Sequence, residues 1–219
     1  MDWTNEKAVA VKYMPIVIHG IHSKWKDQIT KIYFGDLIKT DLNPHVYYEL
    51  VDYGEYKLLI HNYFHRKDYS LNGMHLIRKW DSHHLDFEGH VKCIDNEGEV
   101  LWTATRSHYK LLFQKGDSNI VYIEPESHAI SPSTGEHRWA NQVVLSKDMF
   151  EYVNMKRYWK DFDIHIWPVF RRFHIDRWQD WNDWRIERKF GRVRTAGLLF
   201  KNPAKLYKYA RSCGIVKGV

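Results

Sequence analysis

The sequence predicts a mainly β protein, an antiparallel β-sandwich with a helical, basic C-terminal extension packed on it. Three observations support this. Short runs of β-branched and aromatic residues, separated by turn signals, recur through residues 1–150. Aromatic residues, which favour strands, make up 16% of the 219-residue chain. Residues 151–219 instead show helical patterns and carry 16 Lys and Arg against 7 Asp and Glu, a net charge of +9. We therefore divide the chain at residue 150.

The first third of the chain predicts a strand and a hairpin. The polar segment from Met1 to Val11 is expected to form a short arm, and the β-branched run around Pro15 predicts a strand over 13–19. Residues 21–40 fit either a helix or a strand. Two aromatic runs, 46–51 and 56–64, flank a turn that contains Gly54, which predicts a hairpin.

A second hairpin is expected further along. It consists of a strand over 87–94, a turn over 95–98 and one long strand over 99–113. After a turn over 115–119, residues 120–124 predict a strand that Pro125 ends. A loop over 127–135 and a strand over 142–145 complete the sandwich.

Helices are predicted in the C-terminal extension, from Met149 to Trp159, over 175–190 and over 203–212. Trp178, Trp181 and Trp184 recur every three residues and form a stripe on such a helix, next to Arg185 and Arg188. The stripe fits a face packed on the sandwich, a ligand or membrane-interface contact, or stacking on nucleic acid. The basic charge fits either an anionic partner, whether lipid, nucleic acid or an acidic protein surface, or a solvated face without a partner.

The apolar runs, the N-terminus and the cysteines indicate the cellular location expected of the chain. No apolar run reaches the 18 or so residues of a membrane span, and the N-terminus lacks the pattern of a signal peptide. The chain as given is therefore expected to be soluble and intracellular, with secretion after processing as the alternative. Cys93 and Cys213 lie too far apart for a thiolate zinc motif, and a reduced compartment is the simpler interpretation.

The segment from Asp81 to His90 is the candidate site. In an extended strand Asp86, Glu88 and His90 share one face, and either His83 or His84 reaches it from the preceding turn. Neighbouring carboxylates repel unless a proton, a basic residue or a cation lies between them. Oxygen ligands with one imidazole suit a hard divalent cation. The pattern predicts a metal site, with a solvated strand end as the alternative.

Two segments resemble a known family. Tyr63-Phe64-His65-Arg66-Lys67-Asp68, followed by Ser82-His83-His84-Leu85-Asp86-Phe87-Glu88, is similar to the necrosis- and ethylene-inducing-like proteins (NLPs). Their hallmark reads Trp-Tyr-x-Pro-Lys-Asp and then Gly-His-Arg-His-Asp-Trp-Glu. Ser82, Leu85 and Phe87 depart from it. The segment Ser127-His128-Ala129 also resembles part of a vacuolar sorting-associated family.

The NLP resemblance covers roughly residues 45–130 and implies a β-sandwich with a divalent cation, Ca²⁺ or Mg²⁺ rather than Zn²⁺ or Mn²⁺. Carried over by position, its ligands are Asp68, His83, Asp86 and Glu88, and His128 is a further candidate near the site.

Three functions follow as hypotheses. The first is a binding protein whose cation holds a polar ligand, namely a glycan, a lipid headgroup or a phosphate. The second is a hydrolase of esters or phosphodiesters, in which the metal activates water and His84, His90 or His128 is the general base. No nucleophile elbow, phosphate-binding glycine loop or zincin motif supports it. The third is a structural or interaction protein, for example of a virus, whose basic tail binds nucleic acid or a partner.

Overall fold

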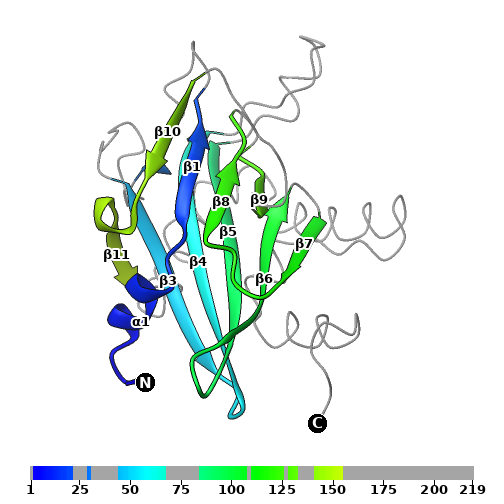
Figure 1. Ribbon diagram of the computed structural model, residues 1–219. Helices are drawn as coiled ribbons and strands as arrows, with labels where there is room; N and C mark the ends of the chain where they lie inside the picture. The colour runs from blue at the N-terminus through cyan, green and yellow to red at the C-terminus, as the bar shows by residue number, and fades with distance from the viewer. Residues whose placement is uncertain are drawn as a thin grey trace, which may run out of the picture.

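The computed structural model describes residues 2–21, 29–30, 44–67, 84–107, 110–125, 128–132 and 141–154. Within these ranges two β-sheets pack face to face, accompanied by two short helical segments (Figure 1). The predicted mainly β sandwich is therefore confirmed. The helices predicted over 175–190 and 203–212, and the tryptophan stripe with Arg185 and Arg188, lie outside the described residues.

The smaller sheet has the strand order β10, β1, β8, β9. The bounds of these strands, in that order, are Gln142–Leu145, Ile16–Gly20, Ile120–Ile123 and Ile130–Pro132. Strand β1 pairs antiparallel with β10 but parallel with β8, and β8 pairs antiparallel with β9. The strands predicted over 13–19, 120–124 and 142–145 are thus present.

The larger sheet has the order β11, β3, β4, β5, β6, β7, with β2 pairing with β4. In chain order the bounds are Ile29–Thr30 for β2, His45–Asp52 for β3, Tyr56–Lys67 for β4, His84–Asp95 for β5, Val100–Ser107 for β6, Lys110–Lys115 for β7 and Glu151–Asn154 for β11. The β3–β4 and β5–β6 hairpins confirm the predictions made from their turn residues. Only β11, parallel to β3, departs from the antiparallel pattern within this sheet.

The N-terminal segment is a helix rather than the predicted arm. Helix α1 spans Glu6–Lys12, and the side chain of Asn5 caps it by accepting a 3.1 Å hydrogen bond from the backbone N–H of Ala8. Val9 and Ala10 are fully buried against the larger sheet. The prediction was wrong because two apolar residues and a cap suffice for a short helix once a sheet buries its apolar side.

Three other predictions are corrected. The strand expected over 99–113 is the hairpin β6–β7, whose turn lacks the usual Gly, Pro or Asn. The loop expected over 127–135 contains β9. The helix expected from Met149 to Trp159 is instead, where the structure describes it, the end of a 3-10 turn, η1 (Lys147–Met149), followed by β11. The backbone of Glu151 donates a 3.0 Å hydrogen bond to Pro44, so a sheet edge overrides the local helical pattern.

Apolar residues hold the two sheets together. One cluster joins Val17, Val121 and Ile130 of the smaller sheet to Val46 and Tyr63 of the larger one. The opposite face of the larger sheet is also buried, around a cluster made of Leu58, Ile60, Val91, Cys93, Trp102 and Ala104. Because both faces are covered, the central parts of β4 and β5 lie in the interior, and buried polar side chains there, such as His61, Asn62 and His90, need partners inside the protein.

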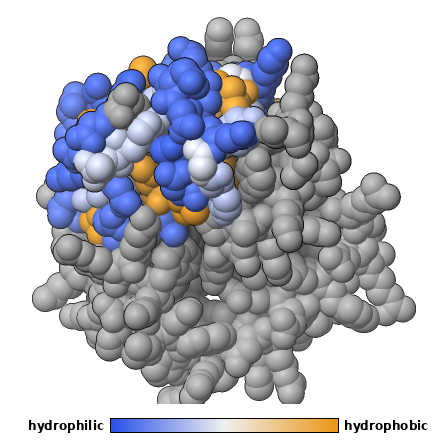
Figure 2. All heavy atoms as spheres, turned by 90° about the horizontal axis from the view of Figure 1, so that it is seen from below, coloured by the Kyte–Doolittle hydropathy of each residue, from blue (hydrophilic) through white to orange (hydrophobic). Residues whose placement is uncertain are grey.

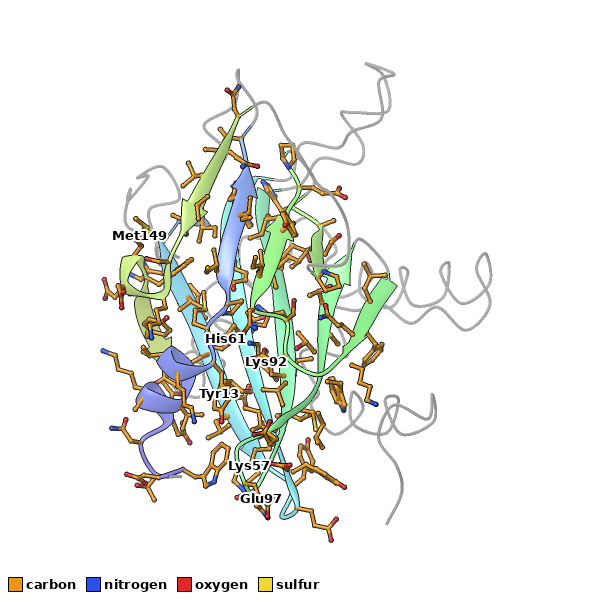
Figure 3. The ribbon with its side chains drawn as sticks, viewed as in Figure 1. Tyr13, Lys57, His61, Lys92, Glu97 and Met149 are labelled. Atoms are coloured by element: carbon orange, nitrogen blue, oxygen red, sulfur yellow. The ribbon has the colours of Figure 1, made fainter. Side chains whose placement is uncertain are left out.

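The end of the sandwich that carries the β3–β4 and β5–β6 turns has a different character. Seen from that end, the described surface is mostly hydrophilic with small apolar patches (Figure 2). Lys57 and Glu97 lie there, whereas His61 and Lys92 lie in the middle of the molecule between the sheets (Figure 3). The buried polar residues His61 and Lys92 therefore lie apart from this hydrophilic surface.

Gly89 of β5 is required by close packing. It pairs with Asn62 of β4, and a Cβ atom at position 89 would overlap the side-chain oxygen of Asn62 and lie 2.6 Å from the carbonyl oxygen of His61. We expect Gly89→Ala to lower the free energy of unfolding by about 3 kcal/mol, because backbone must move to relieve the overlap. Urea unfolding measures this loss.

The double variant Asn62→Ala/Gly89→Ala is the matched control for this prediction. It removes the overlap with the side chain and leaves the overlap with the backbone oxygen, so we expect only part of the loss to be recovered relative to Asn62→Ala alone. A Gly89→Ala protein as stable as the wild type would contradict the prediction.

Candidate functional site

Strand β5 places the predicted residues on one face, as the alternation required. Asp86, Glu88 and His90 are successive same-face positions of this strand, and Glu88 and His90 are 4% and 0% exposed. For His84 and Asp86 the structure describes the backbone only, and Asp68 and His83 lie outside the described residues. The solvated strand end considered above does not describe Glu88 and His90, which are buried.

The register of β4 and β5 adds three side chains to this face. His61 lies opposite His90, Tyr63 opposite Glu88, and His65 opposite Asp86. Directly opposite residues of an antiparallel pair have Cβ atoms about 5 Å apart and point the same way. This face looks toward the smaller sheet, since Tyr63 packs in the cluster between the sheets. A row made of the imidazoles of His61, His65 and His90, with Tyr63 and Glu88, therefore runs through the interior of the sandwich.

Three histidines lie together where β1 approaches this row. We call them the imidazole cluster, and they are His19 of β1, His65 of β4 and His128 of the turn between β8 and β9. The Nε2 atoms of His19 and His65 are 3.0 Å apart. The rings of His65 and His128 stack at a centroid distance of 3.8 Å and an interplanar angle of 3°. All three are buried, with at most 2% exposure.

The backbone of His128 has an uncommon conformation. Its φ is +53°, in the left-handed region that non-glycine residues seldom occupy. The turn that joins β8 to β9 holds it there, because the N–H of His128 donates to the carbonyl of Glu124, and the N–H of Glu124 donates to the carbonyl of Ala129. This conformation costs about 1 kcal/mol or more. It accompanies the placement of the imidazole of His128 against His65.

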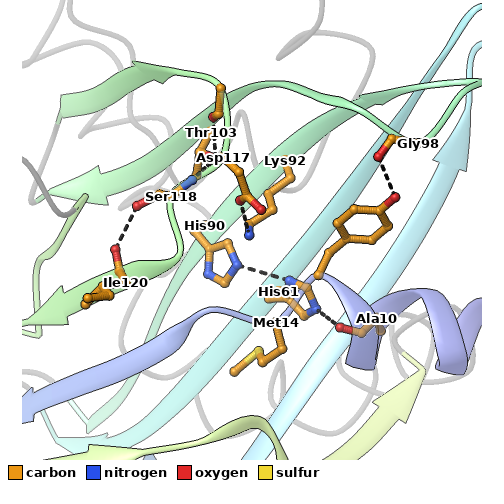
Figure 4. A network of polar contacts seen from close by, with 12 residues as sticks. Ala10, Met14, His61, His90, Lys92, Gly98, Thr103, Asp117, Ser118 and Ile120 are labelled. Carbon is orange, nitrogen blue, oxygen red and sulfur yellow. Dashed lines mark hydrogen bonds and ion pairs between the residues drawn. The ribbon is translucent and has the colours of Figure 1, made fainter.

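A second group, which we call the histidine relay, consists of His61, His90 and Tyr63. Figure 4 shows His61 between His90 and Ala10. The Nε2 atom of His61 lies 3.1 Å from the carbonyl oxygen of Ala10, and this nitrogen must donate because a carbonyl only accepts. The Nδ1 atom of neutral His61 then accepts from Nε2–H of His90 at 3.1 Å. The Nδ1 atom of His90 accepts in turn from the hydroxyl of Tyr63 at 3.2 Å. One proton arrangement satisfies both rings and ties α1 to the sheet.

Three of the buried histidines, His61, His65 and His90, have lowered pKa values and are neutral at neutral pH. Burial, helped by the charge of Lys92, lowers the pKa of His61 to about 3. Burial also lowers the pKa of His90 and of His65 well below the usual value, with smaller contributions from neighbouring histidines. Neutral imidazoles can act as metal ligands or hydrogen-bond partners, and at neutral pH they do not carry the charge of an acid catalyst.

Lys92 follows His90 on the same face and pairs with Asp117. The ammonium of Lys92 is buried, and it forms an ion pair with the carboxylate of Asp117, which is about one-third exposed. The turn that carries Asp117 is held in place by Thr103, whose hydroxyl donates to the carbonyl of Gly116 and accepts from the N–H of Ser118, both at 3.1 Å. Burial lowers the pKa of Lys92, and the pair with Asp117 opposes that effect.

A surface groove of about 440 Å³ lies apart from these residues. Its lining includes Lys7 and Val11 of α1 together with Met149, Phe150 and Tyr152. No residue predicted to bind a metal or to act in catalysis lines it. The groove is therefore a feature of the surface between α1 and β11, separate from the polar interior.

The metal prediction is not tested by this structure. Among the described residues no three His, Cys, Asp or Glu side chains are arranged as a metal site, but two of the four predicted ligands lie outside that part of the chain. The predicted Ca²⁺ or Mg²⁺ site and the proposed roles of His84, His90 and His128 as bases remain predictions. No helix in the described part of the chain has the length and apolar character needed to cross a bilayer.

Sequence reasoning missed His19, His61, His65 and Lys92. The signal for two of them was available, since His61, Tyr63 and His65 alternate in β4 in the same way as Asp86, Glu88 and His90 in β5. Reading 63–68 only as a family motif hid this period-two pattern. His19 had no comparable signal, because a lone histidine at the end of an apolar strand identifies no partner.

No family model and no curated protein matches the chain, and the resemblance to the vacuolar sorting-associated family remains a prediction. Solved structures of NLPs do match it. One, described as a toxin fold for microbial attack and plant defence, is 15% identical, with 69% of this chain and 74% of that chain covered and a TM-score of 0.45.

Necrosis and Ethylene inducing Protein 2, from the causal agent of witches' broom disease of cocoa, is 14% identical, with coverages of 68% and 73% and a TM-score of 0.43. NLPPya in complex with glucosamine is also 14% identical, with coverages of 67% and 72% and a TM-score of 0.42. The chain is thus similar to NLP structures at low sequence identity.

Proposed function

We propose that this protein binds a divalent cation at the end of β4 and β5 where Asp86 and Glu88 lie, and that the cation holds a polar ligand such as a glycan, a lipid headgroup or a phosphate. The observation that carries the proposal is the placement of Glu88, a buried carboxylate, two residues from Asp86 on the face that looks into the sandwich. Asp68 and His83 are the other proposed ligands.

The chemistry of the donor set supports a hard cation. Carboxylate oxygens with one imidazole are ligands that Ca²⁺ and Mg²⁺ accept, and both ions commonly keep open positions for water or for ligand oxygens. Hydroxyl and phosphate oxygens of a polar ligand are the natural occupants of those positions.

Metal removal tests the proposal. We expect the purified protein to contain about one equivalent of divalent metal, and we expect chelation to lower its melting temperature. At a concentration 100 times the dissociation constant, the returning cation contributes about 2.7 kcal/mol of stability. Asp86→Asn and Glu88→Gln are expected to abolish the effect of the cation.

Glu97→Gln is the matched control. Glu97 is an exposed carboxylate of the β5–β6 turn at the far end of the sandwich, so this variant is expected to respond to the cation like the wild type. If the wild type contains no metal, and neither chelator nor added Ca²⁺ or Mg²⁺ changes its melting, the cation proposal fails.

Glucosamine and mannosamine are suitable first probes for the ligand, because NLPPya has been solved with each of them. The probe experiment is calorimetric titration of each sugar into the metal-loaded and the chelated protein. Heat that appears only with the metal supports a site on the cation, whereas equal heat in both samples places the sugar elsewhere.

A further inference from the structure

We propose that His19 and His65 form a two-nitrogen site for a transition-metal ion such as Zn²⁺, Co²⁺ or Ni²⁺. The site lies inside the sandwich beside the carboxylate positions of β5 and uses different donors from the hard-cation site proposed above. It brings together β1 of the smaller sheet and β4 of the larger one, and binding there would connect the two sheets directly.

The spacing of the two nitrogens carries the proposal. The Nε2 atoms of His19 and His65 are 3.0 Å apart. A tetrahedral zinc ion with bonds of about 2.0–2.1 Å holds two nitrogen ligands about 3.3 Å apart. A shift of a few tenths of an ångström, within the freedom of two side chains, therefore converts the direct contact into a chelated ion. Imidazole nitrogens favour this class of metal over Ca²⁺ and Mg²⁺.

The environment of the second ring nitrogen of His65 is a second observation that bears on the metal site. The Nδ1 atom of His65 is buried and has no hydrogen-bond partner among the described residues. Leaving a buried polar atom without a partner costs about 1–3 kcal/mol. Coordination of an ion through Nε2 would leave the proton of the neutral imidazole on Nδ1, and it removes the need for the two rings to share a single proton.

The stacked ring of His128 has a positioning role. Parallel rings 3.8 Å apart present their faces to each other, so the lone pairs of His128 do not converge with those of His65. The stack instead fixes the orientation of the His65 ring toward His19. This agrees with the finding that no three ligands converge among the described residues. Water would complete the coordination.

The pair His61 and His90 of the histidine relay serves as a comparison, because its nitrogens have hydrogen-bond partners that do not require a metal. His61 and His90 also approach within 3.1 Å, but their other nitrogens are engaged by the carbonyl of Ala10 and the hydroxyl of Tyr63. A metal between them would disrupt this fully satisfied arrangement. His61 is therefore the matched control: it is a buried histidine of the same strand, four residues from His65, with a similar ring-to-ring contact.

Titration of the chelator-treated protein with Co²⁺ tests the proposal. We expect visible d–d absorption with one equivalent of Co²⁺ in the wild type and in His61→Gln. His19→Gln and His65→Gln are expected to weaken Co²⁺ binding by more than about 100-fold, since each removes a ligand. Circular dichroism establishes that each variant is folded. Unchanged Co²⁺ binding in folded His19→Gln overturns the proposal.

A measurement on the wild type covers the case in which a variant does not fold. Diamagnetic Zn²⁺ is expected to shift the ring NMR signals of His19 and His65 strongly and those of His61 and His90 much less; the opposite pattern would overturn the proposal. Failure of this proposal can also be distinguished from failure of the proposed Ca²⁺ or Mg²⁺ site. Glu88→Gln should abolish the Ca²⁺ or Mg²⁺ effect but retain Co²⁺ binding, and His19→Gln should do the reverse.

Discussion

Replacing Asp117 by Asn is expected to lower the free energy of unfolding by about 3–5 kcal/mol, whereas replacing Lys92 by Met should leave it nearly unchanged. The two residues form one ion pair, but only Lys92 is fully buried. Without the carboxylate, the ammonium remains in the interior without its counterion. Without the ammonium, Asp117 is exposed enough to be solvated, and the Met side chain fills the space beside Leu59 and Thr103.

Urea unfolding of the two single variants and of Lys92→Met/Asp117→Asn measures this asymmetry. The double variant should resemble Lys92→Met, because the cost of Asp117→Asn arises from the buried charge that Met removes. Equal losses in the two single variants would show instead that the hydrogen bond itself, rather than burial of the charge, determines the stability of this turn.

Acid is expected to unfold the protein well before its carboxylates are fully protonated. The pKa values of His61, His65 and His90 are lowered in the folded protein, that of His61 to about 3, whereas an unfolded histidine titrates near 6.5. Between these two values the unfolded state binds more protons than the folded state, so stability falls as the pH falls.

While it stays neutral in the folded protein, each such histidine lowers the free energy of unfolding by about 1.4 kcal/mol for every pH unit below its unfolded pKa. The three together lower it by about 4 kcal/mol per pH unit. A domain with the usual stability of about 5–15 kcal/mol would lose all of it within roughly one to four pH units below 6.5. Above pH 7 these residues add no pH dependence.

Urea unfolding at a series of pH values between 7 and 4 tests this prediction. His61→Gln should reduce the slope of stability against pH by about one-third. The slope is the relevant readout, because loss of the hydrogen bonds to Ala10 and His90 lowers stability at every pH. A flat profile between pH 7 and 5 would contradict the assignment of neutral buried histidines.

Much of the fold was predictable because turns and alternation are local properties. The β3–β4 and β5–β6 hairpins followed from their turn residues, of which Gly54 (φ +82°) and Gly98 (φ +95°) have positive φ. Hairpin β6–β7 was missed because its turn carries no such residue, and β11 was missed because its neighbour β3 lies about a hundred residues earlier in the sequence. The local sequence pattern therefore could not predict a strand whose pairing partner is distant in the sequence, or a hairpin whose turn has no characteristic residue.

The sequence by itself determined the two marked hairpins and the strands 13–19, 120–124 and 142–145. It also determined that positions 86, 88 and 90 share a face, because side-chain alternation is a property of a single strand. Only the tertiary structure decided that this face points inward and that His65 meets His19, 46 positions away. It also decided that His61 and His90 are joined in a hydrogen-bonded relay. Register and sheet packing arise from contacts between distant segments, and the period of one strand carries no information about its partner.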